Sequence, residues 1–476
     1  MIDRTEFFID GAWTRPEGEG RMPVVEAATE DDLGVIPVAT DRDIDRAVAA
    51  ARRAQPGWAA ATPAERADAL DAFADALAEV AGEVAETVSR QNGMPISLSR
   101  FLEGKFPLIL MRYYADLIRS RAMEDERVSR FNRTLVRRTP VGVVGAIVPW
   151  NYPVTLAVAK IAPALAAGCT LVVKPTPGTA LDSYLLAESA MRAGLPPGIV
   201  NWVPAGREVG EHLVAHPDVD KIAFTGSTAA GRRIGEICGG LIRPVSLELG
   251  GKSAAIVLED ADLPALSQKF FAATLANNGQ TCVSSSRILA PRSRYEEVVD
   301  FVAALASEST VGDPLDPATE IGPLASAEHR DRVERFIRIG REEGARLVAG
   351  GGRPAGLDRG WYVEPTVFAD VASRSTLGQE EIFGPVLSVI PYDDEEDAVR
   401  IANDTEYGLA GSVWSSDVDR ATALARRVET GTIGVNGFDI DPYAPFGGVK
   451  HSGLGREFGP EGLAAFETFQ SIYLPR

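Results

Sequence analysis

Short apolar runs alternate with helix-length stretches through the middle of this chain, and that alternation limits the fold more than any other feature. Strands are predicted for VGVVGAIV (141–148), TLVVKP (170–175), GIVNWVP (198–204) and DKIAFTGS (220–227), because each is an apolar, β-branched run bounded by Gly or Pro. Helical stretches such as SYLLAESAMRAG (183–194) lie between them. Strands that alternate with helices indicate βαβ units and a parallel sheet.

The same pattern starts again in the second half of the chain. A helix is predicted near residues 294–308, and further strands are predicted for SAAIVLE (253–259), RILA (287–290), VLSVIPY (386–392) and GSVWSS (411–416). A chain of 476 residues is long enough for two or three domains with buried cores. We therefore expect an α/β protein with two closely packed α/β domains.

Charge restricts the classes of function. Lys and Arg number 48 and Asp and Glu number 67, which gives a formal net charge of −19. An acidic protein repels nucleic-acid backbones and anionic membranes, so neither is an expected partner. The most apolar stretch is interrupted by prolines, Asn151 and Lys160. These interruptions predict buried strands and a helix in place of a membrane span.

The three cysteines, Cys169, Cys238 and Cys282, are far apart in the sequence and cannot form a disulfide framework. No spacing of Cys and His predicts a metal site. The N-terminal residues have no apolar core followed by a small-residue cleavage site, as a secretory signal would. The expected location is the cytoplasm.

Two predicted strand ends carry residues that suit an anionic cofactor. Gly226 and Ser227 stand between a strand and a helix, where backbone N–H groups and the helix N-terminus can approach a pyrophosphate. Lys174 ends another strand, and ligands of open α/β sheets bind beyond such ends. Each observation also fits an ordinary alternative, a packing turn for the glycine and a solvated loop lysine for Lys174.

Three further residues suit catalysis. Glu248 stands between two leucines, and apolar neighbours raise the pKa of a carboxylic acid towards that of a general base. Cys282 lies in NNGQTC, where small polar neighbours leave a thiol accessible and near backbone N–H donors. Asn151, in the proline-stiffened turn PWNYP, suits an oxyanion donor. Taken singly, each also fits a structural role, as an edge glutamate, a loop thiol and a turn asparagine.

Seven motifs occur in one order: PWNYP, TLVVKP, FTGST, LELGGKS, NNGQTC, EEIFGPV and PFGGVKHSGLGRE. Together they resemble the aldehyde dehydrogenase superfamily over nearly the whole chain. The resemblance implies a Rossmann-like cofactor domain, an α/β catalytic domain and small β segments for oligomerisation. The expected divisions are a cofactor domain at 1–118 and 139–250, a catalytic domain at 251–452, and oligomerisation segments at 119–138 and 453–476.

The resemblance also implies roles for the matched residues. Cys282 would attack the aldehyde, and Asn151 with the Cys282 backbone N–H would stabilise the oxyanion. Glu248 would activate the water that hydrolyses the thioester, and Glu457 would take part in proton movement. The expected cofactor is NAD, with NADP as an alternative. The expected cofactor contacts are Trp150, Lys174, Pro177, Gly226, Ser227, Glu381 and Phe383.

Two positions separate subfamilies. Members that pass the acyl group to coenzyme A usually lack a carboxylate at the position of Glu248, so its presence favours hydrolysis to a free acid. Pro177 stands where NAD-preferring members often have a glutamate that repels the 2′-phosphate of NADP. Its presence leaves NADP use open.

The substrate pocket is expected to be open and uncharged. No Arg or Lys occurs within residues 276–286 to hold a substrate carboxylate, and Asp439 and Asp441 would repel one. Arg112 and Arg287 are the cations outside that window that would change this expectation by pointing into the pocket. We therefore predict a hydrophobic, uncharged aldehyde, whether aliphatic, terpenoid or aromatic. The expected lining residues are Tyr152, Ala159, Ala276, Phe438 and Phe446.

Two alternatives stay open on the sequence. A semialdehyde dehydrogenase would keep the mechanism and change only the pocket. A cysteine-dependent hydrolase or acyltransferase would use Cys282 without a nicotinamide, and such enzymes usually need a histidine base. His212 and His216 are predicted surface residues, and nothing in the spacing places His451 beside Cys282. For the enzyme itself, a homodimer or homotetramer is implied by the resemblance.

Overall fold

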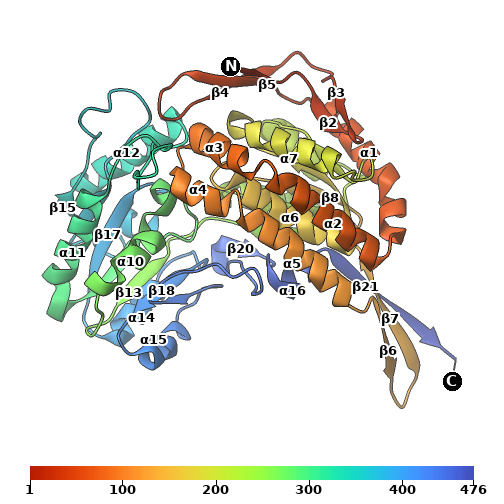
Figure 1. Ribbon diagram of the computed structural model, residues 1–476. Helices are drawn as coiled ribbons and strands as arrows, with labels where there is room; N and C mark the ends of the chain where they lie inside the picture. The colour runs from red at the N-terminus through yellow and green to blue at the C-terminus, as the bar shows by residue number, and fades with distance from the viewer. Residues whose placement is uncertain (476) are drawn as a thin grey trace.

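Two α/β domains lie side by side in the computed structural model, which describes residues 1–475, and a small three-stranded sheet projects from the first of them (Figure 1). The predicted fold class is confirmed. C-terminal strand β20 lies against the first domain, which is built mainly from N-terminal residues, so the chain returns to its first domain near its end.

An eight-stranded sheet forms the centre of the first domain. Its five central strands are parallel, and four of them fall on the predicted apolar runs. Parallel strands end at one edge, so Thr225 and Glu248, which pair across β11 and β12, stand side by side there. The strand order is β20 (Gly453–Leu454), β12 (Val245–Glu248), β11 (Lys221–Thr225), β8 (Val143–Ile147), β9 (Thr170–Lys174), β10 (Val200–Trp202), β2 (Phe7–Ile9) and β3 (Ala12–Thr14).

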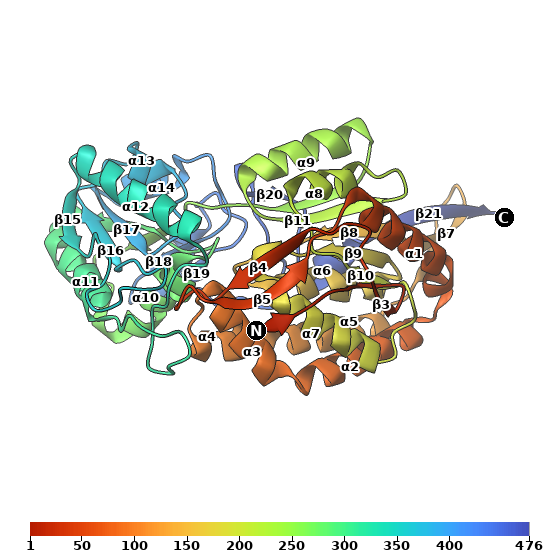
Figure 2. The same ribbon diagram turned by 90° about the horizontal axis from the view of Figure 1, so that it is seen from above.

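Helices cover both faces of this sheet (Figure 2). The central one is α6 (Pro153–Ala167), which is apolar at almost every position and is accordingly buried on nearly all sides. One face carries α1 (Asp41–Ala60), α8 (Arg207–Ala215) and α9 (Thr228–Gly240). The layer on the other side contains α2 (Pro63–Ala78), α3 (Ala81–Asn92), α4 (Ile96–Leu102), α5 (Phe106–Ser120), α6 and α7 (Leu181–Arg192).

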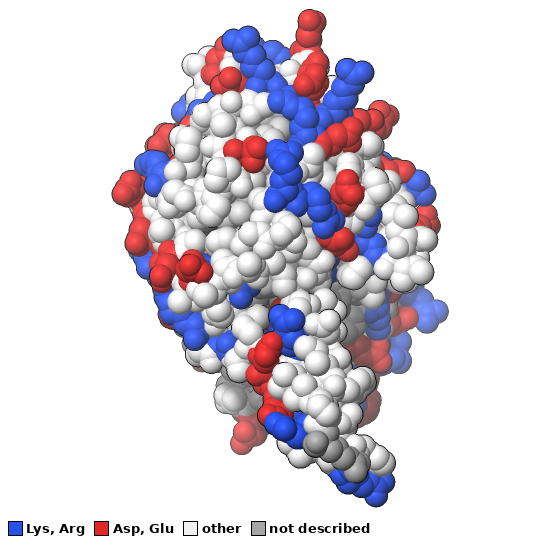
Figure 3. All heavy atoms as spheres, turned by 90° about the vertical axis from the view of Figure 1, so that its right-hand side faces the viewer, with Lys and Arg blue, Asp and Glu red and all other residues white. Residues whose placement is uncertain are grey.

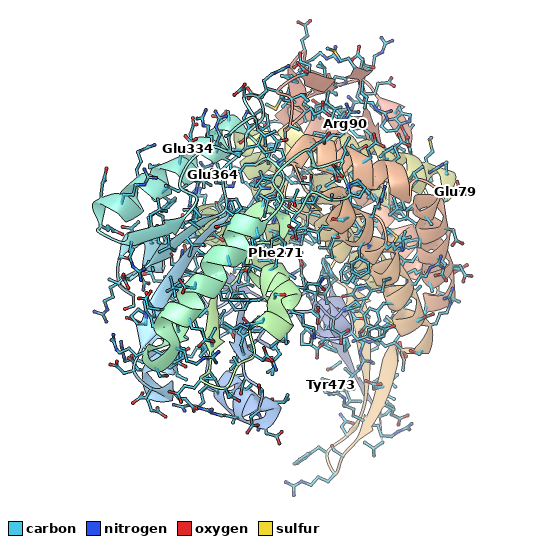
Figure 4. All side chains as sticks on the ribbon, turned by 60° about the vertical axis from the view of Figure 1, so that its left-hand side comes forward. Glu79, Arg90, Phe271, Glu334, Glu364 and Tyr473 are labelled. Atoms are coloured by element: carbon cyan, nitrogen blue, oxygen red, sulfur yellow. The ribbon has the colours of Figure 1, made fainter. Side chains whose placement is uncertain are left out.

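A seven-stranded sheet forms the centre of the second domain, and it contains all four strands predicted there. The order is β15 (Arg346–Ala349), β16 (Thr366–Ala369), β17 (Val386–Tyr392), β14 (Arg287–Pro291), β13 (Ala254–Val257), β18 (Gly411–Trp414) and β19 (Gly434–Val435). Its helices are α10 (Ser267–Thr274), α11 (Tyr295–Glu308), α12 (Ala327–Glu342), α13 (Thr376–Gln379), α14 (Glu395–Asn403) and α15 (Val418–Ala425). Figure 4 shows α10, with Phe271 labelled, on the side of this domain that faces the first.

The projecting sheet is antiparallel and consists of β6 (Glu124–Val128), β7 (Arg133–Pro140) and β21 (Glu467–Leu474). Phe469, Ile472 and Tyr473 of β21 are exposed on it. Figure 3 shows uncharged atoms over much of the projection, and Figure 4 labels Tyr473 on it. This sheet is the part of the molecule where an apolar surface lies furthest from either core.

The C-terminal division differs from the expected one. Within the described residues 453–475, only β21 joins the projecting sheet, because β20 pairs with β12 and α16 (Gly459–Ala464) packs against α6. The pairing of β20 satisfies backbone groups at an edge of the first sheet that would otherwise stay open.

A further small sheet near the N-terminus was not predicted; it has the order β1 (Ile2–Asp3), β5 (Asp32–Pro37), β4 (Arg21–Val25). None of the helices within residues 1–475 combines the length and the apolar character that crossing a membrane requires.

Candidate active site

Two cavities meet at Cys282, one on each side of its thiol. The first, of about 370 Å³, is an apolar tunnel, and the second, of about 430 Å³, is a cleft beyond the C-terminal edge of the first sheet. Cys282, Glu248, Thr225 and Leu249 line both. A thiol at this junction can contact one ligand in the tunnel and a different one in the cleft.

The NNGQTC turn, which carries Cys282, has an unusual backbone conformation. Asn277 and Asn278 both have left-handed backbone angles, with φ of 52° and 61°, which Asn tolerates better than most residues. The side chain of Asn278 donates to the Gly93 and Pro323 carbonyls at 2.9 and 2.8 Å. The turn is therefore fixed from both domains by side-chain hydrogen bonds, and the sequence predicted neither the strain nor the anchors.

Burial disfavours the charged form of the Cys282 thiol. Burial raises its pKa to about 12, and the carboxylates of Glu381 and Glu248 raise it further in the same direction. The backbone N–H groups of Cys282 and Val283 act in the opposite sense. The thiol is protonated at neutral pH in this structure and needs a base to become a nucleophile.

Asn151 lies against the Cys282 turn. It is 3% exposed, and its side-chain N–H donates to the Gln280 carbonyl at 3.0 Å. The backbone carbonyl of Asn151 accepts hydrogen bonds from the side chains of Asn92 and Asn277. An amide nitrogen has two N–H groups, so one remains for a ligand in the cleft that Asn151 lines.

Glu248 ends β12 and is 4% exposed. Neither of its carboxylate oxygens has a hydrogen-bond partner of good geometry within residues 1–475. Burial raises its pKa well above the ordinary value, the nearby Glu457 charge raises it further, and Lys160, Arg456 and the Gly448 backbone lower it less. A buried carboxylate with two open oxygens has the properties of a general base.

A buried ion pair stands next to Glu248. Lys160 Nζ lies 2.7 Å from Glu457 Oε1 and donates to Thr225 Oγ1 at 2.6 Å. Glu457 Oε2 has no partner among the described residues. The sequence singled out Lys160 only as an interruption of an apolar stretch; a charged residue in an otherwise apolar helix is the signal that would have identified this pair.

The cleft contains five of the seven residues expected to contact the cofactor: Trp150, Gly226, Ser227, Glu381 and Phe383. Ser227 is the N-cap of α9, and its hydroxyl accepts from Ala230 N. The other first-turn N–H groups of α9 are thus available to an anion. The Trp150 and Phe383 rings are in edge contact at 5.5 Å.

Close contacts with Glu381 and with the Cys282 carbonyl explain why the LELGGKS motif contains two glycines. Glu381 Oε1 accepts from Gly251 N at 3.0 Å, and its Oε2 accepts no hydrogen bond within the described part of the chain. A side-chain carbon on Gly250 would collide with Glu381, and one on Gly251 would lie 2.7 Å from the Cys282 carbonyl oxygen. The free Oε2, the rings and the α9 N-terminus fit the hydroxyl, aromatic and phosphate groups of a nicotinamide dinucleotide.

Lys174 and Pro177 do not line this cleft. Lys174 Nζ donates to the Ala205 carbonyl at 2.7 Å, and burial lowers its pKa to about 8. Pro177 is buried and begins the short 3₁₀ turn Pro177–Thr179 after β9. Both lie further along the sheet edge than the cleft reaches.

Three residues of α12, Glu328, His329 and Arg332, line the cleft and were not predicted. His329 Nε2 donates to the Phe383 carbonyl at 2.6 Å, and burial lowers the pKa of this histidine to about 4. Arg332 donates to the Glu381 carbonyl at 2.6 Å. His329 is therefore neutral with one nitrogen occupied, which makes it a poor base for Cys282. No motif marks α12, so only the packing of the domains could identify these residues.

Four of the five expected substrate residues line the tunnel: Tyr152, Ala276, Phe438 and Phe446. The Tyr152 hydroxyl bonds to Thr281 Oγ1 at 2.7 Å. The prediction for Ala159 is wrong, because this residue is 1% exposed and lies in the hydrophobic core. Thr155 and Leu156, near the start of α6, line the tunnel, whereas Ala159 lies further along the helix. Further apolar lining residues that the sequence did not predict are Leu98, Phe101, Leu102, Phe106, Ala272, Ala273, Ile440 and Phe458.

No Lys or Arg within residues 1–475 lines the tunnel. Arg287 is buried and donates to the backbone carbonyls of Lys252, Ile401 and Ala402. Arg112 pairs with Asp75 at 2.6 Å. Neither lines the tunnel. Within residues 1–475 no group of three His, Cys, Asp or Glu side chains is arranged to hold a metal ion.

Comparison with known proteins agrees with this geometry. A profile of the aldehyde dehydrogenase family matches residues 13–472. Geranial dehydrogenase of Castellaniella defragrans is 57% identical over 476 residues, which cover 99% of each chain. The 3-succinoylsemialdehyde-pyridine dehydrogenase of a Pseudomonas species is 41% identical and also covers 99% of each chain.

Solved structures of aldehyde dehydrogenases are also similar to this chain. Mycobacterium tuberculosis aldehyde dehydrogenase in complex with NAD⁺ superposes with a TM-score of 0.98 at 47% identity, covering 100% of this chain and 99% of that one. A mutant of aldehyde dehydrogenase C from Pseudomonas syringae, in complex with NAD⁺ and octanal, has a TM-score of 0.95 at 39% identity, covering 98% and 96%.

Proposed function

The chain belongs to the aldehyde dehydrogenase family and oxidises an aldehyde with NAD. From this premise we propose that its substrate is an uncharged, hydrophobic aldehyde, which it oxidises to the free acid through hydrolysis of a thioester. One observation carries the proposal. An apolar tunnel ends at Cys282, beside a buried carboxylate with no hydrogen-bond partner within residues 1–475.

Cys282 acts as the nucleophile in this proposal. Glu248 removes its proton, and the sulfur then forms a bond to the aldehyde carbon. The carbonyl oxygen becomes an oxyanion held by the spare N–H of Asn151 and by the backbone N–H of Cys282. Fixed donors of this kind are worth about 3 kcal/mol each in acyl transfer. The support is that Asn151 and the Cys282 turn are fixed to each other by the Asn151–Gln280 hydrogen bond.

The cofactor occupies the cleft on the other side of the thiol. NAD, when bound there, accepts the hydride that leaves the substrate carbon. Glu381 holds a ribose hydroxyl through Oε2, Trp150 and Phe383 orient the ring, and the α9 N-terminus at Gly226 and Ser227 holds phosphate. Lys174 and Pro177 are proposed to contact the adenosine end, beyond the cleft. Pro177 carries no charge that would repel a 2′-phosphate, so NADP is an alternative cofactor.

Hydrolysis completes the reaction. Glu248 takes a proton from water as the oxygen attacks the thioester carbon, and the carbon–sulfur bond then breaks to release the acid and regenerate the thiol. Overall, aldehyde, NAD⁺ and water give carboxylate, NADH and two protons. Glu457 and Lys160 pass the protons outward. This role is supported by their buried ion pair, with 2.7 Å between Lys160 Nζ and Glu457 Oε1, which lies next to Glu248. Coenzyme A has no part in this scheme.

The substrate class follows from the tunnel wall. It is lined by Phe, Leu, Ile and Ala side chains, with no Arg or Lys among the described residues that line it. The similarity to an enzyme named for geranial and to a structure that contains octanal supports a terpenoid or medium-chain aldehyde. A semialdehyde with a terminal carboxylate is the competing candidate, and the absence of Arg and Lys from the described tunnel lining disfavours it.

Assembly and location complete the proposal. The projecting sheet exposes Phe469, Ile472 and Tyr473, which supports its use as a contact between copies in a homodimer or homotetramer. The first domain is proposed to bind the cofactor, the second to carry the nucleophile, and the protein to act in the cytoplasm.

The test measures NADH absorbance with purified enzyme, NAD and NADP in parallel, without coenzyme A. The panel is acetaldehyde, octanal, geranial, benzaldehyde and succinic semialdehyde, with Cys282→Ala as the control. Turnover of octanal and geranial that is lost in the variant is the expected result. A preference for succinic semialdehyde would refute the substrate class, and activity only after addition of coenzyme A would refute hydrolysis.

A further inference from the structure

One charged side chain stands at the outer end of the substrate tunnel. Among the described residues that line it, only Glu248 and Asp439 carry a formal charge. Glu248 is buried at the inner end beside Cys282, whereas Asp439 is exposed on the loop after β19. Phe101 and Ile440, which are 51% and 40% exposed, line the same tunnel. The mouth is therefore apolar except for one carboxylate.

The structure separates Asp439 from Asp441, which the sequence treated alike. Asp441 Oδ1 accepts from Tyr443 N at 2.9 Å and closes a turn, and Asp441 does not line the tunnel. Asp439 has no hydrogen bond and no ion pair within residues 1–475. No cation of the described structure therefore forms an ion pair with Asp439, which lines the tunnel.

A lysine of the second domain lies next to this carboxylate. A carbon placed on Gly437 would lie 3.9 Å from Asp439 Oδ2 and 3.5 Å from Lys269 Cδ, so both side chains border the same glycine. Lys269 is exposed on α10, the helix that also supplies Ala272 and Ala273 to the tunnel and whose position Figure 4 marks through Phe271. Its charge opposes that of Asp439 without a direct ion pair between them in the described structure.

We propose that Asp439 selects the aldehyde by charge: it disfavours substrates with a carboxylate at the far end relative to neutral and cationic ones. The inference rests on the proposed function, because it concerns the tunnel of that site. When the aldehyde carbon of a substrate lies at Cys282, the other end of the substrate molecule points to the mouth of the tunnel. A carboxylate there meets an unpaired like charge between apolar walls, which concentrate the field.

The size of the effect follows from the exposure of Asp439. Exposed charge pairs are worth about 0.2 to 1 kcal/mol, which limits the change in kcat/KM to about 1.4- to fivefold. Screening by salt acts over about 8 Å at physiological ionic strength and over less at higher salt. The selectivity should therefore weaken as salt is added, unlike selectivity caused by shape.

The experiment uses a series of aldehydes that differ in charge: betaine aldehyde, butanal and succinic semialdehyde. In Asp439→Asn, kcat/KM for succinic semialdehyde relative to butanal should rise about 1.4- to fivefold, and that for betaine aldehyde relative to butanal should fall by a similar factor. Lys269→Met should move both ratios the other way. At 0.5 M salt the ratios of variant and wild type should converge.

Asp441→Asn is the matched control, because it changes the net charge by the same amount, lies on the same loop and can keep the Tyr443 hydrogen bond. Equal ratios in the two Asp variants, or a shift of the cationic and anionic aldehydes in the same direction, would overturn the proposal. Failure of the proposed function would instead appear in the wild-type enzyme, as a preference for succinic semialdehyde over butanal.

Discussion

Replacing Glu248 with Gln should stop the enzyme after its first turnover. Gln keeps the size of the side chain and its polarity, but it cannot accept a proton. Glu248 is 4% exposed and neither of its oxygens has a partner within residues 1–475, so no protein hydrogen bond is lost in the exchange. The change therefore removes one property, the basicity of a single carboxylate.

The expected loss is set by what a general base contributes. Such a group typically accelerates a step by about 100- to 10,000-fold, or about 3 to 5 kcal/mol in the barrier. Burial and the charge of Glu457 raise the pKa of Glu248, and a stronger base is more effective as long as it is deprotonated. We expect a loss of kcat in the upper half of that range at pH 8.

The assay is a rapid-mixing measurement of NADH with octanal, followed by the steady state. If hydride transfer still occurs, the variant should release up to one NADH per active site and then stall, because its thioester is not hydrolysed. Cys282 could still use hydroxide as the base, so the first turnover should become faster with pH. Steady-state turnover at the wild-type rate would refute the role of Glu248 in hydrolysis.

Stability provides the control for folding. A carboxyl group whose pKa is raised in the folded state binds more protons than in the unfolded state, so its contribution to stability falls as pH rises from its unfolded pKa through its raised folded pKa. Gln does not titrate, so the free energy of unfolding of Glu248→Gln should decrease less with pH than that of the wild type. A variant that unfolds at lower urea concentration at pH 8 would indicate a structural role instead.

Three further predictions address other groups. Lys160→Met leaves Glu457 buried without its cation and should cost about 3 to 5 kcal/mol in the free energy of unfolding, seen as a lower urea midpoint, whereas the double variant with Glu457→Gln should recover part of the loss. Lys174, whose pKa is about 8, loses its charge above that pH, so KM for NAD should rise from pH 7 to pH 9 in the wild type and stay level in Lys174→Gln; a parallel rise in both would exclude a cofactor contact. Phe469→Asp together with Tyr473→Asp should shift the mass measured by light scattering towards the monomer, and an unchanged mass would exclude the projecting sheet as an interface.

The alternation of strands and helices in the sequence determined the fold class. It also determined which apolar runs form central strands. Apolar runs such as VGVVGAIV can only be buried on both faces, and that local property requires no tertiary information. Cys282, Glu248 and Asn151 were also identified from the sequence: each, taken singly, also fitted a structural role, and the resemblance of the seven ordered motifs to the aldehyde dehydrogenase superfamily implied their roles. The structure brings all three to the cleft.

Tertiary structure alone decided which residues meet across the two domains. His329 and Arg332 lie in no motif, and they reach the cleft because α12 packs against the loop that carries Phe383. Ala159 was expected in the tunnel, but it stands one helical turn too deep, and a sequence does not state how far along a helix a cavity extends.

The same distinction applies to charge. From the sequence, Asp439 and Asp441 were expected to act alike, and Lys160 was only an interruption in an apolar stretch. The fold directs Asp439 into the tunnel, ties Asp441 to Tyr443 and places Lys160 against Glu457. Local sequence determined which side chains were present and which segments would form strands and helices. Only packing determined which charges are paired, because an ion pair joins residues that are distant in the chain and depends on side-chain directions that no local pattern encodes.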